Sequence, residues 1–247
     1  MKFNITASSK TGCVRKNNED MVLIDHWFVR DGNLTAMMDT TKVDRYMLAL
    51  ADGMGGHNSG EVASSDVLHN LQYFFSDMPV GLSISEFNEA IYEWLVSINM
   101  IIDAKGHAEE RYSKMGTTLV ALAYYGKAFY WMNCGDSRIY RYHEGKLTQL
   151  STDHSLSTLL GHNEHSNIIT NCIGGGCKSS YIDIVECTTD VISGDIFLIC
   201  SDGLNDMLTD EDIAWALAEG YDADSLCSLA EEAGGKDNVS AIVAQVL

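Results

Sequence analysis

The stretch MLALADGMGG, residues 47–56, decides how the rest of the chain is interpreted: its apolar half ends in Asp52-Gly53, and two more glycines follow. A short apolar run bounded by glycine predicts a buried strand. Glycine also lets the backbone turn sharply and leaves no side chain to block an approaching group. Asp52 would then lie at the mouth of a strand beside an open carbonyl, which suits a hard divalent cation. A tight turn with a solvated aspartate is the alternative.

The composition is strongly acidic, which excludes some classes of partner. The 247 residues include 16 basic and 35 acidic side chains, for a net charge of −19. A chain of this charge is not expected to bind nucleic acid or an anionic membrane surface. An anionic substrate would need a local reversal of charge, which bound metal ions would supply. No repeat and no Pro/Ser-rich linker divides the chain, so we expect a single domain over residues 1–247.

The seven cysteines have no Cys-x-x-Cys spacing, so a zinc site is not expected. They predict reduced, mostly buried thiols in a cytoplasmic protein. The first ten residues, MKFNITASSK, lack the apolar core of a signal peptide, and no apolar stretch reaches the ~18–20 residues of a membrane span. The shortage of exposed apolar signals favours a monomer.

The periodicity of apolar residues predicts an α+β fold in which helices pack on antiparallel sheets. Helical spacing predicts two long helices over about 59–76 and 86–106 and two short ones over 210–219 and 224–233. The second long helix begins at the capping box Ser83-x-x-Glu86. Its apolar stripe is interpreted as core packing rather than as a docking surface. The stripe comprises Phe87, Ile91, Trp94, Leu95, Ile98, Ile101 and Ile102.

Runs with a strand-like period fill most of the remaining chain. They cover 3–8, 21–29, the stretch that ends at Asp52, 117–125, 127–134, 138–142, 146–150, 181–188, 196–201 and 239–246. The four runs between 117 and 150 predict one antiparallel meander. Asp31-Gly32-Asn33 predicts a hairpin turn, followed by an irregular polar link to the strand before Asp52. Residues 151–179 have no clear period and predict an irregular loop.

Acidic residues stand repeatedly at the ends of apolar runs. These positions are Glu19-Asp20, Asp52, Asp136, Asp202 and Asp237. Converging strand ends would bring them to one rim of a stack of sheets. Carboxylates that converge repel one another unless cations neutralise them. Four anionic ligands would balance two divalent ions, roughly −4 against +4, and their hard oxygen atoms favour Mg²⁺ or Mn²⁺.

Such a pair of ions suits the hydrolysis of a phosphate ester. Two divalent ions ~3.5–4 Å apart make hydroxide available near neutral pH and bind phosphoryl oxygens, so no covalent enzyme intermediate is needed. Arg15 lies four residues before Glu19 and would reach the same rim. Its planar guanidinium group is well matched to phosphate.

Eight collinear segments resemble one known family. They are GCVRKNNED at 12–20, LALADGMGGHNSGEVAS at 48–64, MGTTLVAL at 115–122, NCGDSRIY at 133–140, TDHSL at 152–156, NIITNCIG at 167–174, LICSDGL at 198–204 and DNVSAIV at 237–243. Together they resemble the metal-dependent serine/threonine protein phosphatases of the type 2C (PPM) family, in particular its compact bacterial members. The resemblance covers nearly the whole chain. It implies a four-layer α-β-β-α sandwich, in which helices flank two antiparallel sheets.

The resemblance also implies a role for each acidic position. Asp52 resembles the carboxylate that bridges two Mn²⁺ or Mg²⁺ ions. The other implied ligands are Asp202 and Asp237 at the first ion, Glu19 or Asp20 with the carbonyl of Gly53 at the second, and Asp136 with Asp202 at a third, weaker ion. Which of the adjacent acids Glu19 and Asp20 coordinates directly differs among relatives.

The implied reaction removes phosphate from phosphoserine or phosphothreonine. A water or hydroxide bridging the ions would attack phosphorus in line, and Arg15 would bind the phosphate. Phosphorylated proteins are therefore the implied substrates. A cognate Ser/Thr kinase is a partner suggested by family analogy alone.

The sequence departs from the family pattern at two places. Met54 stands where many eukaryotic members have a histidine that protonates the leaving alkoxide, which methionine cannot do. His57 is a candidate for this role; a histidine bonded only to backbone, with a metal-bound water as the acid, is the alternative. The segment 155–166 is shorter than the flap of bacterial relatives, which predicts a more open cleft with His162 and His165 facing solvent.

Two other functions are compatible with these patterns. A pseudophosphatase would be a binding module of the same fold that has lost turnover, although all the metal carboxylates are present. A two-metal nuclease or another phosphodiesterase would use similar ions. The net charge of −19 and the lack of basic patches argue against a nuclease.

Overall fold

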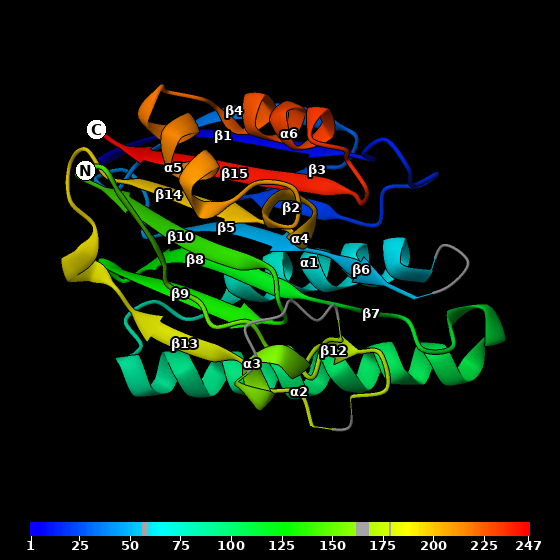
Figure 1. Ribbon diagram of the computed structural model, residues 1–247. Helices are drawn as coiled ribbons and strands as arrows, with labels where there is room; N and C mark the ends of the chain where they lie inside the picture. Colours follow the sequence, from blue (N-terminus) through cyan, green and yellow to red (C-terminus); the bar gives the residue numbers. More distant parts are fainter. Residues whose placement is uncertain (56–58, 162–167, 178) are drawn as a thin grey trace.

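The computed structural model describes residues 1–55, 59–161, 168–177 and 179–247. Two six-stranded antiparallel sheets form its centre (Figure 1). The first sheet contains, in spatial order, β11 (Lys146–Gln149), β10 (Arg138–His143), β14 (Ile196–Cys200), β15 (Val239–Val246), β1 (Lys2–Lys10) and β4 (Gly32–Asp39). The second contains β13 (Asp183–Glu186), β9 (Ala128–Cys134), β8 (Leu119–Tyr125), β5 (Arg45–Ala51), β2 (Met21–Ile24) and β3 (Trp27–Val29). A small third sheet contains β12 (Ile173–Gly174), β7 (Gly116–Thr117) and β6 (Gly53–Met54).

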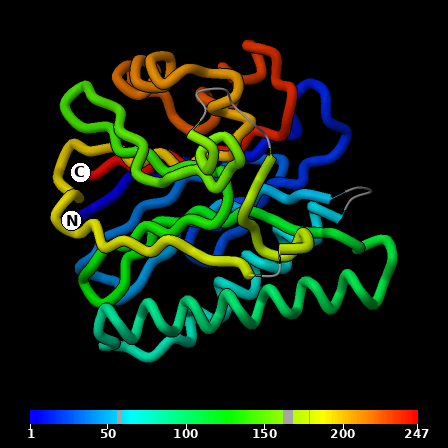
Figure 2. The backbone as a smooth tube through the Cα atoms, turned by 60° about the horizontal axis from the view of Figure 1, so that its bottom comes forward, coloured from blue at the N-terminus to red at the C-terminus, as the bar shows by residue number. Residues whose placement is uncertain are grey.

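Helices pack on both sheets. Apolar side chains of α1 (Ser59–Asp77) and α2 (Ile84–Ala108) join those of the second sheet in one core cluster, and α5 (Asp210–Ala218) and α6 (Ala223–Glu232) join the first sheet in another. The remaining helical segments are α3 (Leu156–Leu160), α4 (Asp202–Asn205) and the 3₁₀ turns η1 (Glu110–Tyr112) and η2 (Thr188–Asp190). Figure 2 shows α2 running the length of the molecule and the two termini lying close together. None of the helices described is long and apolar enough to cross a membrane.

Strand β5 shows how the sheets are stacked. Successive side chains of a strand point to opposite faces. Met47 and Ala49 pack with α1 and α2, whereas Leu48 and Leu50 pack in the cluster shared by the two large sheets. The strand is therefore buried on both faces, which explains why its sequence is apolar throughout instead of alternating. Burial on both faces also fixes its register, and with it the position of Asp52.

Most predicted elements are present. The α+β class and the antiparallel pairing are confirmed, all four predicted helices end within two residues of their predicted bounds, and β15 has its predicted bounds. The capping box is confirmed, because the side chains of Ser83 and Glu86 each accept a hydrogen bond from the other's backbone N–H. The apolar stripe of α2 is buried except at Ile101, which is 51% exposed, so the prediction for that residue is wrong.

The predictions for residues 21–44 are partly wrong. The predicted strand 21–29 breaks after Ile24 into β2 and β3, which are joined by a turn at Asp25, where φ is 57°. Asp31-Gly32-Asn33 closes no hairpin, because β3 and β4 belong to different sheets. Most of the predicted polar link is strand β4, which pairs with β1.

The predicted meander over 117–150 is also wrong. β8 and β9 form a hairpin in the second sheet, whereas β10 and β11 form one in the first. The chain crosses between the sheets at Gly135-Asp136-Ser137. The predicted loop 151–179 contains α3 and β12.

Candidate active site

The second sheet brings two of the acidic residues together. Met21 and Ala51 are paired in the ladder between β2 and β5, so Asp20 and Asp52 are neighbours at this end of the sheet. The main chain of Asp52 is held by Thr118. The Asp52 N–H donates to Thr118 Oγ1 (3.0 Å), and the Asp52 carbonyl accepts from the Thr118 N–H (2.9 Å).

The first sheet supplies the other acidic residues. Arg138 pairs with Cys200 across β10 and β14, so the crossover that carries Asp136 lies beside Asp202, the first residue of α4. Asp237 stands just before β15, the strand next to β14. The structure therefore gathers residues that are far apart in the sequence at one end of both sheets.

The loop before β2 is tied to this end by Asn238. The side-chain amide of Asn238 donates to the carbonyls of Thr11 and Asn17, at 2.9 Å each, and its Oδ1 accepts from the Glu19 N–H at 2.9 Å. One buried side chain therefore links the segment 12–20 to the segment 237–243.

The adjacent acids have different surroundings. Asp20 is fully buried; its Oδ2 accepts from the Ser201 hydroxyl (2.8 Å), and its Oδ1 has no hydrogen-bond partner among the described residues. Glu19 is half-buried, and its Oε2 lies 2.8 Å from the place a Cβ on Gly60 would take. A Cβ on Gly53 would lie 2.2 Å from the Gly60 carbonyl oxygen. Glycine is therefore required where Glu19, the start of α1 and the turn after Asp52 meet.

Burial raises the pKa of the clustered carboxyls, and mutual repulsion adds to the effect. The pKa of Asp20 and of Asp136 is raised to about 7 and that of Asp202 to about 6. The pKa of Asp52 is raised well above its usual range by burial, and the negative charges of Asp20, Asp202, Asp136 and Asp237 raise it further. These residues are therefore close enough to sense one another's charge.

The donors in the cluster fit a hard divalent cation. The Oδ1 atoms of Asp20, Asp136 and Asp202 are buried without a hydrogen-bond partner in the described part of the chain. Such atoms destabilise a fold unless something binds them, and carboxylate oxygens are what Mg²⁺ and Mn²⁺ prefer. Among residues 1–55, 59–161, 168–177 and 179–247, no group of three or more His, Cys, Asp or Glu side chains is arranged closely enough to hold a metal ion. Carboxylates that repel one another are expected to stand apart when no cation is bound. The argument that this cluster fits a divalent cation therefore rests on the type of its donor atoms.

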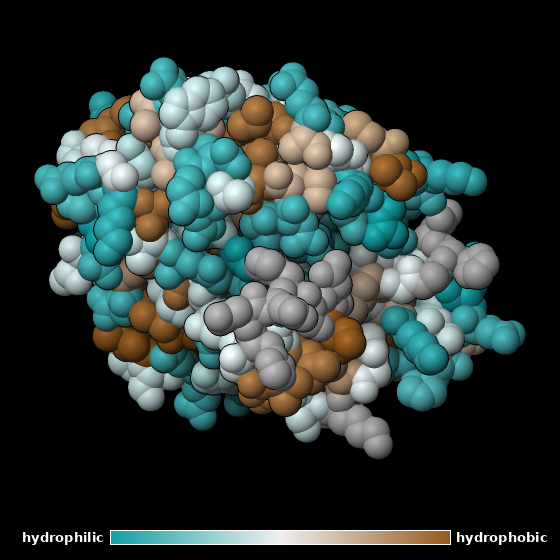
Figure 3. Space-filling view, in the orientation of Figure 1, coloured by the Kyte–Doolittle hydropathy of each residue, from teal (hydrophilic) through white to brown (hydrophobic). Residues whose placement is uncertain are grey.

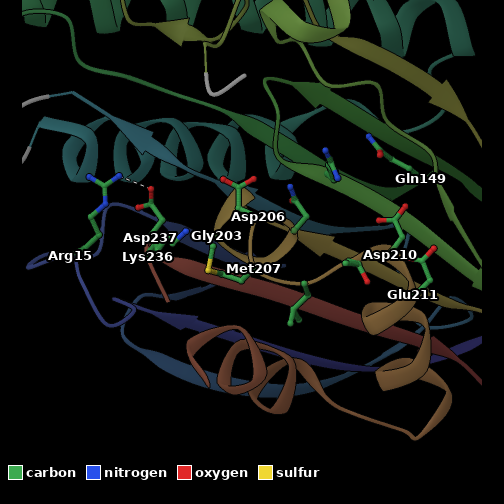
Figure 4. A pocket seen from close by; sticks show the side chains of 13 residues that line it. Arg15, Gln149, Gly203, Asp206, Met207, Asp210, Glu211, Lys236 and Asp237 are labelled. Carbon is green, nitrogen blue, oxygen red and sulfur yellow. Dashed lines mark hydrogen bonds and ion pairs between the residues drawn. The ribbon is translucent and has the colours of Figure 1, made fainter. Parts of the chain in front are cut away.

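A cleft of about 940 Å³ opens beside the cluster (Figure 4). Arg15, Lys236 and Asp237 line one end of it, and Asp210 and Glu211 line the other. The Arg15 Nη2 donates to Asp237 Oδ2 at 2.5 Å. On the face shown in Figure 3, hydrophilic side chains gather around the position of α4. The clustered residue Asp237 therefore lies at the same end of the cleft as the cationic side chains of Arg15 and Lys236.

Two cleft residues were missed by the sequence analysis. Asp206 follows Asp202 by four residues, a spacing that places both on one side of a helical turn, and its charge raises the pKa of Asp136 and Asp202. That spacing was a usable signal. Lys236 lines the cleft next to Asp237, and nothing in the sequence distinguishes it from other surface lysines.

Several predicted residues cannot be placed. His57 lies in 56–58, and His162 and His165 lie in 162–167, all outside the described residues. Their predicted roles stay predictions. Met54 is the second residue of β6, and α3 forms the first part of the segment 155–166.

The chain resembles known proteins over most of its length. A family model described as Protein phosphatase 2C matches residues 36–241. The serine/threonine protein phosphatase PstP of Mycobacterium tuberculosis is 34% identical over 251 residues, which cover 98% of this chain and 44% of PstP. This chain therefore spans less than half the length of that relative.

Solved structures match over the whole fold. The serine/threonine phosphatase of S. agalactiae has a TM-score of 0.83 at 28% identity, and the match covers 99% of this chain and 100% of that one. The catalytic domain of PstP in complex with two manganese ions has a TM-score of 0.74 at 33% identity, covering 99% of each chain. With its family model matched over most of its length, the chain belongs to the protein phosphatase 2C family and is similar to bacterial serine/threonine phosphatases.

Proposed function

We propose that this chain is a metal-dependent protein phosphatase that hydrolyses phosphoserine and phosphothreonine. The observation that carries the proposal is a cluster of buried acidic side chains beside a cleft lined by Arg15. Three of these side chains have an oxygen without a hydrogen-bond partner in the described part of the chain. The relatives support it, because PstP and the S. agalactiae protein are named as serine/threonine phosphatases and the PstP catalytic domain was solved with two manganese ions.

The acidic cluster would hold the cations. The proposed ligands are Asp52, Asp202 and Asp237 at one ion, Asp52, the Gly53 carbonyl and Glu19 or Asp20 at a second, and Asp136 with Asp202 at a third. When bound, Mn²⁺ or Mg²⁺ would activate a water as the nucleophile and neutralise negative charge on the phosphoryl group.

The chain's own residues would bind and orient the substrate. Arg15 can donate paired, charge-assisted hydrogen bonds to phosphate oxygens. It is now bonded to Asp237, so a cation on Asp237 would compete with this ion pair and free the guanidinium for the substrate. His57 stays the candidate proton donor to the leaving group, because Met54 has no proton to give.

The remaining expectations accompany this function. We infer a single domain with α-β-β-α layering that acts as a monomer in the cytoplasm. Its partners would be phosphorylated proteins, including a cognate Ser/Thr kinase, and not nucleic acid or a membrane. A more open cleft is expected from the shortened flap.

The test is hydrolysis of a phosphothreonine peptide and of a small aryl phosphate by the purified chain. We expect phosphate release with Mn²⁺ and background rates after chelation with EDTA, since the nucleophile depends on the cation. Calorimetric binding of two Mn²⁺ ions without turnover would indicate a pseudophosphatase. Degradation of DNA or RNA in the same buffer would indicate a nuclease.

Replacing Arg15 by alanine should weaken substrate binding. A hydrogen bond to a charged group contributes about 1.5–3 kcal/mol, so kcat/KM for the aryl phosphate should fall about 10- to 100-fold. Most of the change should be in KM, measured by steady-state kinetics at saturating Mn²⁺. Arg15→Lys is the matched control. Its kcat/KM should lie between those of the unmodified protein and Arg15→Ala, because lysine keeps the positive charge but lacks the planar guanidinium group. An unchanged KM in Arg15→Ala would show that the guanidinium does not contact phosphate.

A further inference from the structure

The segment TDHSL, residues 152–156, has no part in the proposed mechanism, yet its His154 is buried next to the crossover that carries Asp136. The His154 backbone N–H donates to the Gly135 carbonyl at 2.9 Å, and the His154 Nδ1 accepts from the Gly135 N–H at 3.1 Å. One residue therefore holds both polar backbone groups of Gly135.

Neighbouring groups fix the tautomer of the His154 ring. The Asn171 amide donates to the Tyr181 carbonyl (2.8 Å) and accepts from the Tyr181 N–H (3.1 Å), which settles its orientation. Its nitrogen therefore faces His154 Nδ1, at 2.8 Å, as a donor. With two donors directed at Nδ1, the ring proton must be on Nε2, which donates to Asp183 Oδ2 at 3.0 Å. By accepting the hydrogen bond from Nε2, Asp183 keeps the imidazole in the tautomer whose Nδ1 can accept from the Gly135 N–H.

The crossover is also fixed from its other side. Gly135 has a φ of 127°, and a Cβ there would lie 2.6 Å from the Thr118 side chain. The hydroxyls of Thr118 and Ser137 are hydrogen-bonded at 2.7 Å. Asp136 lies between these two anchors; it is 9% exposed, and its Oδ1 has no hydrogen-bond partner among the described residues. The direction of that oxygen therefore depends on how Gly135 is held.

We propose that His154 is a positioning residue: oriented by Asp183, it fixes the Gly135 peptide and thereby directs Asp136 toward the cation site that it shares with Asp202. The proposal rests on the proposed function, which supplies the cation. In the proposed assignment Asp136 binds only the third ion, the weaker one that the resemblance implies, so the TDHSL segment is assigned to that site. Groups that orient a metal ligand typically change metal affinity by about 10- to 100-fold.

The test compares His154→Leu with His154→Asn. Leucine fills the space but accepts no hydrogen bond, whereas the asparagine oxygen can replace Nδ1 as the acceptor for Gly135. Calorimetric titration should show that His154→Leu lowers the affinity for the most weakly bound Mn²⁺ ion about 10-fold or more. The affinities for the more tightly bound ions should not change. At limiting Mn²⁺, kcat should fall with KM unchanged, and excess Mn²⁺ should restore it. His154→Asn should recover most of the affinity.

A second variant guards against misfolding of the first. Asp183→Ala removes a partly exposed side chain and leaves the buried imidazole in place; it should weaken the same ion by a smaller factor. Thermal unfolding in EDTA checks the fold of each variant. The proposal would be overturned if the folded variants gave the same Mn²⁺ binding isotherms as the unmodified protein, or if the affinity for every ion fell by the same factor. Absence of Mn²⁺-dependent turnover in the unmodified protein would instead overturn the proposed function, so the two failures are distinguishable.

Discussion

Replacing Asp52 by asparagine is expected to abolish hydrolysis of a phosphothreonine peptide while preserving the fold. The proposed bridging role requires the negative charge of Asp52, and a metal pair contributes several kcal/mol of transition-state stabilisation. We therefore expect kcat at saturating Mn²⁺ to fall by about 10³-fold or more. The fold should survive because asparagine has the shape of aspartate, and the main-chain hydrogen bonds that hold residue 52 to Thr118 do not involve the side chain of residue 52.

The stability of the metal-free variant should change in the opposite direction. Burial and the charges of neighbouring acids raise the pKa of Asp52 well above its usual range, so an uncharged side chain relieves repulsion. The free energy of unfolding in EDTA should therefore rise, as measured by urea denaturation. Asp77→Asn, at the exposed end of α1, is the control. It should leave kcat unchanged and should change the free energy of unfolding by no more than about 0.5 kcal/mol. Retention of a tenth of the activity by Asp52→Asn would contradict the bridging role.

The elements that the sequence predicted well are those whose burial dictates the residue pattern. Strand β5 is buried on both faces, so its whole run is apolar and ends visibly at Asp52. Helix α2 buries one face and carries its own start signal at Ser83. The acidic residues were found for a related reason: a carboxylate directly after an apolar strand is conspicuous, because charged residues are seldom placed there without a partner.

The connections between the sheets could not be predicted in the same way. Gly126 closes a hairpin within one sheet and Gly135 carries the chain to the other, yet both follow a strand-like run and precede another. Strand β4 was missed because most of it is exposed or half-buried, so its sequence has no long apolar run to mark it as a strand. The contact between His154 and Gly135 joins residues 19 positions apart, and no local pattern encodes it.

The metal-free protein should lose stability as the pH rises from about 5 to 8. The pKa of Asp20 and Asp136 is about 7 and that of Asp202 about 6 in the folded protein, against ~3.9 in an unfolded chain. Between these values the folded protein binds more protons, so the free energy of unfolding falls as pH increases. The stabilisation is complete below the unfolded pKa and is lost as pH rises through 6 to 7. Carboxyls with a lowered pKa, such as Asp224, act in the opposite direction but only in more acidic solution.

Mn²⁺ should remove this pH dependence, because the cation and the protons compete for the same oxygen atoms. The rise in melting temperature on replacing EDTA by Mn²⁺ should therefore be larger at pH 8 than at pH 5. Mn²⁺ binding near pH 6 should also release protons, so the calorimetric binding enthalpy should depend on the ionisation enthalpy of the buffer. Asp136→Asn should flatten the curve in EDTA, whereas Asp77→Asn should not. A melting temperature in EDTA that held constant or rose over this range would mean that the acids do not share one buried site, because separated and solvated carboxylates would be fully ionised throughout it.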